Sequence, residues 1–164
     1  MRIRELERHE WALFRELRLR ALADSPDAFA RTLAEALGED DAYWVKLTES
    51  VTAPGGQVML VAEVQGRPVG MAFGLFDKER AKTGHVAGMW VDPDARGRGA
   101  GGALLDAAVA WARSRGLDRL ELWVTKGNGP AERLYERAGF ADTGRRDALA
   151  SNPALQTIQM ALTL

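Results

Sequence analysis

A run of small residues after an apolar segment is the first part of the sequence with a recognisable chemical use. Residues 97–102 read Gly-Arg-Gly-Ala-Gly-Gly, and they follow Trp90 and Val91, which are expected to end a strand. Small residues let the backbone approach a ligand closely, and the first N–H groups of a helix have no partners within it. Because the helix dipole adds positive potential there, the segment predicts a phosphate site. Arg96 and Arg98 add side-chain donors for phosphate oxygens.

The glycines also satisfy a second pattern, the dinucleotide fingerprint G-x-G-x-x-G, through Gly97, Gly99 and Gly102. That fingerprint follows its strand directly, and an acidic residue ends the next strand. Here Pro93 and further residues separate the strand from the glycines, and the next expected strand ends in Val-Thr. A nicotinamide dinucleotide is therefore the weaker interpretation. A glycine turn without a ligand is also disfavoured, because ordering several glycines costs much conformational entropy.

A second regularly spaced segment occupies residues 128–140, which read Asn-Gly-Pro-Ala-Glu-Arg-Leu-Tyr-Glu-Arg-Ala-Gly-Phe. Ala131, Leu134 and Tyr135 stand at positions i, i+3 and i+4, so a helix would place them on one face. Gly139 is expected to end that helix and to return the chain to the sheet.

The start of this helix decides what Asn128 can do. Asn is a favoured helix cap, so capping is its ordinary role. We expect Pro130 at the first helical position, which would make Gly129 the cap. The amide of Asn128 would then be free to contact a ligand.

Together the two segments resemble the cofactor motifs of the Gcn5-related N-acetyltransferase (GNAT) superfamily. Arg96-x-x-Gly99-x-Gly101 is similar to the pyrophosphate loop of that superfamily, and residues 128–140 are similar to its other cofactor segment. The resemblance is good over residues 57–140. It implies acetyl-CoA as cosubstrate and an acyltransferase that acts on an amine.

The resemblance also implies the roles of individual residues. Main-chain groups at the end of the fourth strand would bond the pantetheine arm of acetyl-CoA, and the N–H groups of the loop would hold the pyrophosphate. Tyr135 is the expected catalytic residue, because a phenol stays protonated at neutral pH and can donate a proton to the departing thiolate. The implied cofactor-binding residues are Met89, Trp90, Val91, Arg96, Gly97, Arg98, Gly99, Ala100, Gly101, Gly102, Asn128 and Tyr135.

The general base stays open at this point. Many members of the superfamily place a Glu on the fourth strand, whereas residues 83–91 contain no carboxylate. His85 lies six residues from Val91, roughly 20 Å along an extended strand, so a surface histidine is its simpler interpretation. The other candidates are Glu63, Glu121 and Glu35, and a water chain or an amine already neutral in solution would need no named residue.

The acceptor is an amine of unspecified structure. By resemblance its cleft would be lined by Phe29, Arg31, Thr32, Glu35, Tyr43, Trp44 and residues 145–152. Such a mixed lining suits a small polar amine or an amino acid without selecting one. Residues 1–50 hold eleven acids against eight bases, which would suit a cationic acceptor but is more simply a solvated helix face.

Composition excludes several other classes of protein. The 164 residues contain no Cys and two His, which removes disulfides and thiolate chemistry and makes a metal site unexpected. The 22 basic residues against 23 acidic ones argue against a general nucleic-acid binder. No apolar run approaches the ~20 residues that span a bilayer, and no signal peptide is evident. We therefore expect a cytoplasmic protein with no metal, no nucleic acid and no membrane partner.

The elements that must position these motifs form one domain over residues 1–164. Changes of hydrophobic period predict an α/β (α+β) fold, with a central mixed, mostly antiparallel sheet of about six to seven strands flanked by helices. Expected strands cover residues 3–6, 57–64, 69–76, 83–91, 120–124, 140 onward and 157–164. Expected helices cover residues 10–23, 26–38, 40–50, 102–115 and 130–138.

The sequence thus predicts an acetyl-CoA-dependent N-acetyltransferase in which a primary amine attacks the thioester directly. A non-catalytic acyl-CoA-binding module is the rival from another class, and a protein N-terminal or lysine acetyltransferase is the rival within the class. An exposed edge strand would allow the chain to form a homodimer.

Overall fold

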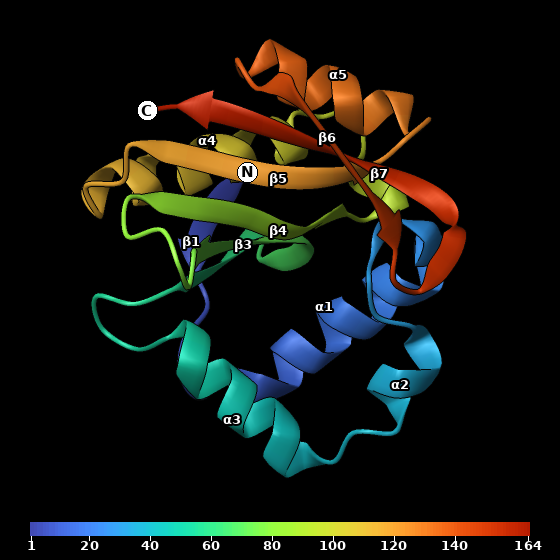
Figure 1. Cartoon of the computed structure of the whole chain (residues 1–164). Helices are drawn as coiled ribbons and strands as arrows, with labels where there is room; N and C mark the ends of the chain where they lie inside the picture. Colours follow the sequence, from blue (N-terminus) through green and yellow to red (C-terminus); the bar gives the residue numbers. More distant parts are fainter.

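A seven-stranded sheet lies between two layers of helices in the computed structural model, which describes residues 1–164 (Figure 1). The strand order is β1-β2-β3-β4-β5-β7-β6, and all neighbours are antiparallel except β4 and β5. The strands are β1 (Arg2–Glu5), β2 (Val58–Val64), β3 (Arg67–Phe76), β4 (Thr83–Val91), β5 (Arg119–Thr125), β6 (Ala141–Leu149) and β7 (Asn152–Thr163). The helices are α1 (Trp11–Asp24), α2 (Leu33–Leu37), α3 (Asp41–Val51), α4 (Ala100–Ser114) and α5 (Gly129–Arg137), with 3-10 turns at Pro26–Ala28 and Pro93–Ala95. The expected mixed, mostly antiparallel sheet is confirmed.

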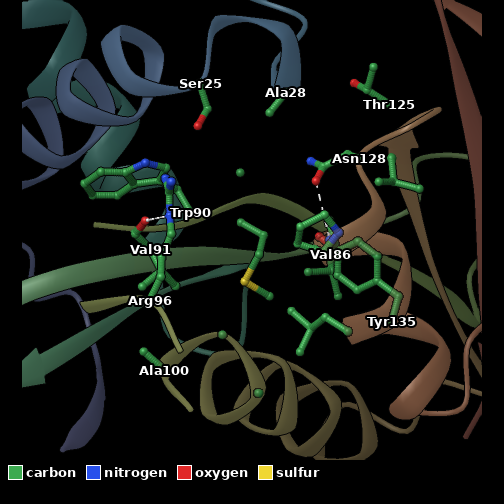
Figure 2. Close-up of a pocket in the computed structure, with 18 of the residues that line it drawn as sticks. Ser25, Ala28, Val86, Trp90, Val91, Arg96, Ala100, Thr125, Asn128 and Tyr135 are labelled. Atoms are coloured by element: carbon green, nitrogen blue, oxygen red, sulfur yellow. Dashed lines mark hydrogen bonds between the residues drawn. The ribbon is translucent and has the colours of Figure 1, made fainter. Parts of the chain in front are cut away.

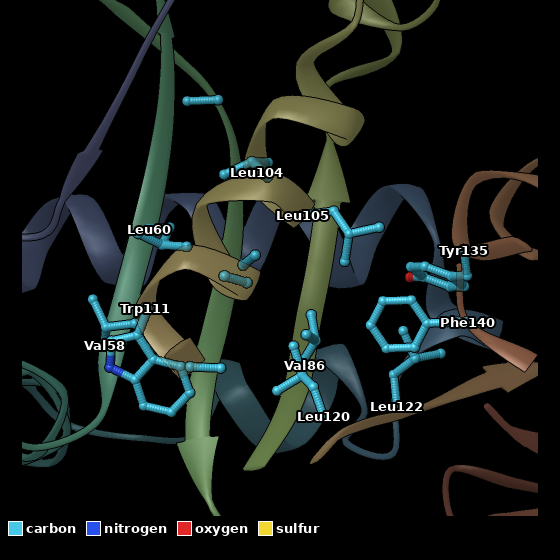
Figure 3. Close-up of a cluster of buried hydrophobic side chains, with 14 of the residues drawn as sticks. Val58, Leu60, Val86, Leu104, Leu105, Trp111, Leu120, Leu122, Tyr135 and Phe140 are labelled. Atoms are coloured by element: carbon cyan, nitrogen blue, oxygen red, sulfur yellow. The ribbon is translucent and has the colours of Figure 1, made fainter. Parts of the chain in front are cut away.

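Each face of the sheet has its own apolar core. Helices α4 and α5 cover one face, where Leu104, Leu105 and Trp111 pack against the strands (Figure 3). Helices α1, α2 and α3 cover the other face, where the rings of Phe14 and Trp44 meet edge to face with centroids 5.7 Å apart. Because both faces are covered, β2 and β3 are nearly continuous apolar runs rather than alternating ones.

The segment expected to form one helix over residues 26–38 is divided, so that prediction was wrong. After the 3-10 turn, Phe29 is extended, with φ of −130°, and it is buried in the core beneath α1. A new helix, α2, is then capped by Thr32, whose side chain accepts from the Glu35 N–H while the Glu35 carboxylate accepts from the Thr32 N–H. Burial of an aromatic ring and a reciprocal capping box therefore override the helical pattern of the sequence.

Strands β2 and β3 are joined by a tight hairpin turn. Gln65 and Gly66 form a two-residue turn in which both residues have positive φ, 52° and 76°. Such turns match the twist of the flanking strands. Strand β3, which follows this turn, pairs with β4, the strand on which the site is built.

No helix in the structure combines the length and the apolarity needed to cross a bilayer. No group of three or more His, Cys, Asp or Glu side chains is arranged to hold a metal ion. A cytoplasmic location stays a prediction.

Candidate active site

Strands β4 and β5 separate partway along their length, and this separation creates the site. They pair in parallel only from Thr83 opposite Arg119 to His85 opposite Glu121. Strand β4 stays bonded to β3 on its other side as far as Val91. One edge of β4 beyond His85 therefore keeps main-chain groups that pair with no strand.

A cavity of about 560 Å³ occupies the space between the separated strands (Figure 2). Strand β4, the end of β5, the glycine loop and α5 all contribute to its walls, and we call it the cofactor cavity. It brings together every cofactor-binding residue predicted from the sequence except Arg98: Met89, Trp90, Val91, Arg96, Gly97, Gly99, Ala100, Gly101, Gly102, Asn128 and Tyr135.

The glycine loop presents a row of unpaired main-chain N–H groups. Gly97 and Gly99 have φ of 74° and 84°, a conformation that side chains rarely adopt, and no atom occupies the space beside Gly97 or Gly102. None of the N–H groups of residues 97–102 donates to another group of the chain. Because α4 begins at Ala100, these donors stand at the positive end of a 15-residue helix. Such donors suit phosphate oxygens, and their use for phosphate stays a prediction.

The two arginines of this loop, Arg96 and Arg98, differ in their contacts. Arg96 Nε donates to the Val91 carbonyl oxygen at 2.9 Å, and its guanidinium pairs with Asp24 at the end of α1. Arg98 has no hydrogen bond or ion pair within the chain and does not line the cavity. Arg96 therefore fixes the exit of β4 against α1, and a role for either arginine in binding phosphate stays a prediction.

Asn128 caps α5, which corrects the expected start of that helix. The helix begins at Gly129, Pro130 takes its second position, and Asn128 Oδ1 accepts from the Ala131 N–H at 3.4 Å. Pro is compatible with either of the first positions, because N–H groups there have no helical partner in any case. Asn128 still lines the cofactor cavity, with its amide nitrogen free of the capping bond (Figure 2).

Tyr135 reaches from α5 toward the strands, and its side chain is buried beside Phe140 with ring centroids 6.2 Å apart (Figures 2 and 3). Its hydroxyl makes no hydrogen bond within the chain, although Tyr135 lines the cofactor cavity. Burial raises the pKa of Tyr135 to about 12, because the phenolate would lose its hydration. Tyr135 is therefore held in the protonated form that a proton donor requires.

Gly88 produces a bulge in β4 that the sequence reasoning missed. Met71 pairs with Trp90 but Phe73 pairs with Ala87, so two residues of β4 oppose one of β3. Gly88 has φ of 59°, and a Cβ there would lie 2.4 Å from the Phe73 ring. A Gly inside a strand pattern is the available signal for such a bulge, and β4 holds two, Gly84 and Gly88.

Two further cavities meet the cofactor cavity at this bulge, because Ala87 and Gly88 line all three. One, of about 430 Å³, lies among α1, α3 and the β3–β4 face, and we call it the aromatic cavity. The other, of about 760 Å³, extends beneath the β6–β7 hairpin. Among the residues predicted to line an acceptor cleft, Arg31, Tyr43 and Trp44 line the aromatic cavity, while Phe29 and residues 147–150 line the third. Thr32 and Glu35 line none of them, because they cap α2.

The three carboxylates considered as general bases are all bonded to other groups of the chain. Glu121 is 1% exposed and accepts from Arg80 and Arg119, and these bonds lower the pKa of its carboxyl to about 2. Glu63 is paired with Arg4 at the other end of the sheet, and Glu35 is occupied in the capping box.

His85 has a different environment from those carboxylates. Its ring is half-buried, lines the third cavity, and lies 2.7 Å through Nε2 from Asp77 Oδ2. The pKa of Asp77 is held well below its ordinary value, mainly by the Arg80 side chain and by N–H groups of the following turn. The carboxylate therefore accepts from Nε2–H and leaves Nδ1 of His85 as the free basic nitrogen. No sequence signal pointed to Asp77, because only the pairing of β3 with β4 brings it to His85.

Comparison with known proteins agrees with this geometry. Residues 6–140 match the acetyltransferase (GNAT) family, so the chain belongs to that family. The chain is 34% identical over 136 residues to a mycothiol acetyltransferase of Beutenbergia cavernae, in an alignment that covers 83% of this chain and 42% of that protein. The chain thus spans about two fifths of the length of this curated relative.

Solved structures show the same fold at low identity. A GNAT-family acetyltransferase from Streptococcus pneumoniae superposes with a TM-score of 0.83 at 22% identity, over 99% of this chain and 98% of that one. A protein of Salmonella typhimurium, solved with its cofactor acetyl-CoA, gives a TM-score of 0.81 at 22% identity over 100% of this chain and 94% of its own. The family is one of acetyltransferases, as the two sequence motifs predicted, and the Salmonella structure contains the cosubstrate that they predicted.

Proposed function

We propose that this chain transfers an acetyl group from acetyl-CoA to the primary amine of a small molecule or an amino acid, by direct attack while both substrates are bound. The observation that carries the proposal is the cofactor cavity, where two sets of unpaired main-chain groups converge. One set lies along β4 after His85, and the other is the row of N–H groups in the glycine loop.

These two sets suit two successive parts of a CoA molecule. The loop donors and the start of α4 would hold the pyrophosphate, and the free edge of β4 would bond the pantetheine amides in the manner of an added strand. N–H groups near the bulge at Gly88 would polarise the thioester carbonyl. Bound acetyl-CoA supplies the acetyl thioester itself.

Tyr135 would act as the proton donor. Attack by the amine nitrogen forms the new N–C bond and breaks the C–S bond, which leaves a thiolate that needs a proton. Tyr135 is protonated at neutral pH and lines the cavity from the side of α5. It would give its proton to the sulfur and recover one from solvent afterwards.

His85 would accept the proton that the amine loses. It stands on β4 two residues before Ala87, the point where the three cavities meet, which is roughly 7 Å along the strand. Water in the third cavity, which His85 lines, would carry the proton from the amine to the imidazole. Asp77 would hold the imidazole in the tautomer that leaves Nδ1 free.

The test of the proposal is a comparison of wild type with Tyr135→Phe. We expect acetyl-CoA-dependent release of free thiol across a panel of amines, and a fall in kcat of about 10²- to 10⁴-fold in the variant. Acetyl-CoA affinity and the melting temperature should hold, because the hydroxyl bonds no group of the chain and the ring is kept. Unchanged turnover in Tyr135→Phe would rule out the proton-donor role.

The same panel separates the alternatives. Stabilisation by acetyl-CoA together with silence towards every amine would favour a non-catalytic binding module. Turnover with peptides alone would favour a protein N-terminal or lysine acetyltransferase. A rise in melting temperature with NAD, but not with acetyl-CoA, would favour the dinucleotide interpretation. Self-association through the edge strands β1 or β6 would appear in the molecular mass in solution.

A further inference from the structure

The aromatic cavity carries information about the acceptor. Its apolar lining comes mainly from α1, α3 and β3, and its only formally charged residues are Arg18, Arg31 and Lys78. No Asp or Glu lines it. The local charge is therefore positive, although residues 1–50 as a whole carry an excess of acids.

Two hydrogen-bond donors in this cavity have no partner. Among all buried side-chain nitrogen and oxygen atoms of the chain, only Arg18 Nη1 and Trp44 Nε1 bond nothing. Buried polar groups are nearly always paired, so each unpaired one calls for an explanation. Both residues line the aromatic cavity, and both groups can only donate. A ligand that accepts hydrogen bonds would satisfy both donors.

Arg18 also lacks a counterion. It forms no ion pair, and burial lowers its pKa because the cation has lost hydration without gaining a carboxylate. Arg31 lines the same cavity but is satisfied by Glu39 and the Tyr43 hydroxyl. Lys78 is exposed at the surface and forms no ion pair either. A ligand that carries one negative charge would complete the Arg18 site.

The positive charge of Arg18 lies close to the bulge in β4, beside which acetyl transfer would take place. Its guanidinium stacks on the Phe29 ring with the Cζ atom 4.8 Å from the centroid. Arg18 Nη1 also lies 3.6 Å from where a Cβ on Gly88 would stand, at the bulge where the cavities join. An anion bound to Arg18 would therefore place a neighbouring amine beside the free edge of β4.

We propose that the acceptor is an amino acid or a similar small amine whose carboxylate binds Arg18 and whose apolar side chain occupies the aromatic cavity beside Phe14, Tyr43 and Trp44. This inference rests on the proposed acetyltransferase function and narrows its acceptor class. A cavity of about 430 Å³ is within the range of about 300 to 1,000 Å³ typical of small-ligand sites. A carboxylate fits the Arg18 guanidinium, which presents parallel N–H donors.

The test compares each amino acid with its own carboxamide, for a series with apolar side chains. The amide keeps the amine and the side chain and removes only the charge. The amine of an amide also has a lower pKa, so more of it is neutral and reactive, and amine chemistry alone would favour the amide. We expect wild type to prefer the acids by about 10- to 100-fold in kcat/KM, the effect of one charge-assisted hydrogen bond pair.

Two variants assign that preference to Arg18. Arg18→Met keeps the length of the side chain and removes its charge, and it should bring the ratio of acid to amide to one or below. Its melting temperature should be equal to or above that of wild type, because an unpaired buried cation is removed. Arg15→Met is the matched control on the same helix, since Arg15 lies outside the cavity and contacts Asp41. It should keep the wild-type ratio.

The results that would contradict the carboxylate site differ from the result that would contradict the acetyltransferase function. Equal use of acids and amides by wild type would overturn the carboxylate site while leaving the acetyltransferase function intact. An equal loss on acids and amides in Arg18→Met would show instead that Arg18 acts on the transfer step common to both, which also overturns the proposal. Binding of acetyl-CoA without acetylation of any amine would refute the proposed function itself.

Discussion

Replacement of Gly88 by Ala tests whether the bulge in β4 is required by both the fold and the site. The substitution adds one methyl group at a position where φ is 59° and where Ala87 and Gly88 line all three cavities. Two separate penalties follow from this geometry. One is the left-handed backbone conformation, and the other is the contact of the new Cβ with Phe73.

The size of each penalty follows from the structure. A left-handed conformation costs an L-residue about 1–2 kcal/mol relative to Gly. A Cβ at 2.4 Å from the Phe73 ring cannot be accommodated without movement, and Phe73 is itself packed against Phe14 with centroids 5.4 Å apart. Overpacking of this kind costs about 1–3 kcal/mol. Together they predict a loss of about 2–5 kcal/mol in the free energy of unfolding, or roughly 4–20 °C in melting temperature.

The assay is urea unfolding and thermal melting of Gly88→Ala beside the control Gly66→Ala. Gly66 has φ of 76° in the β2–β3 turn, with no atom within 4 Å of its potential Cβ, so the control carries the backbone penalty alone. Gly88→Ala should be less stable than the control by about 1–3 kcal/mol. Its rate of thiol release, measured at a temperature where both variants are folded, should fall at least about tenfold, because small displacements of reacting groups are costly. Equal stability of the two variants together with full activity in Gly88→Ala would refute this account of the bulge.

Two further predictions concern pH. Since the carboxyl of Glu121 has a pKa of about 2 rather than the ordinary 4.5, its contribution to stability is complete above about pH 4.5 and is lost as the pH falls towards about 2. Glu121→Gln should therefore lower the free energy of unfolding at neutral pH by about 3 kcal/mol, and the difference from wild type in urea titrations should shrink in acid; a difference that does not depend on pH would contradict the ion-pair explanation. His85→Gln should reduce turnover most where the acceptor amine is protonated, by about 10²-fold or more, and the rate should recover as the amine loses its own proton at higher pH. Asp77→Asn should give a smaller loss of the same form, and a pH profile of His85→Gln parallel to that of wild type would remove His85 as the base.

Much of the lining of the cofactor cavity could be predicted because its determinants are local. The loop around Gly99 needs only consecutive small residues, a following helix and its unpaired N–H groups, and each is set by neighbours in the sequence. The face that carries Tyr135 follows in the same way from helical spacing. Similar reasoning placed β4 at its observed bounds of Thr83–Val91.

Two expectations about helices failed, for different physical reasons. The helix expected over residues 26–38 is interrupted because burial of Phe29 in the core favours extended backbone, which is a contact between distant parts of the chain. The cap of α5 was expected at Gly129 and lies instead at Asn128, since the two placements of Pro130 differ by one residue and both are sterically allowed.

Local patterns in the sequence were therefore enough to specify most of the elements, the two motifs and the family to which they point. The place where the chemistry can occur depends on tertiary structure, because a strand register, a bulge and an ion pair need partners far apart in the chain. The shift between β3 and β4 at Gly88 joins three cavities, and the same pairing brings Asp77 to His85. Only the packing of α1 against α3 leaves Arg18 and Trp44 with unpaired donors in one cavity, which is why the acceptor could not be read from composition.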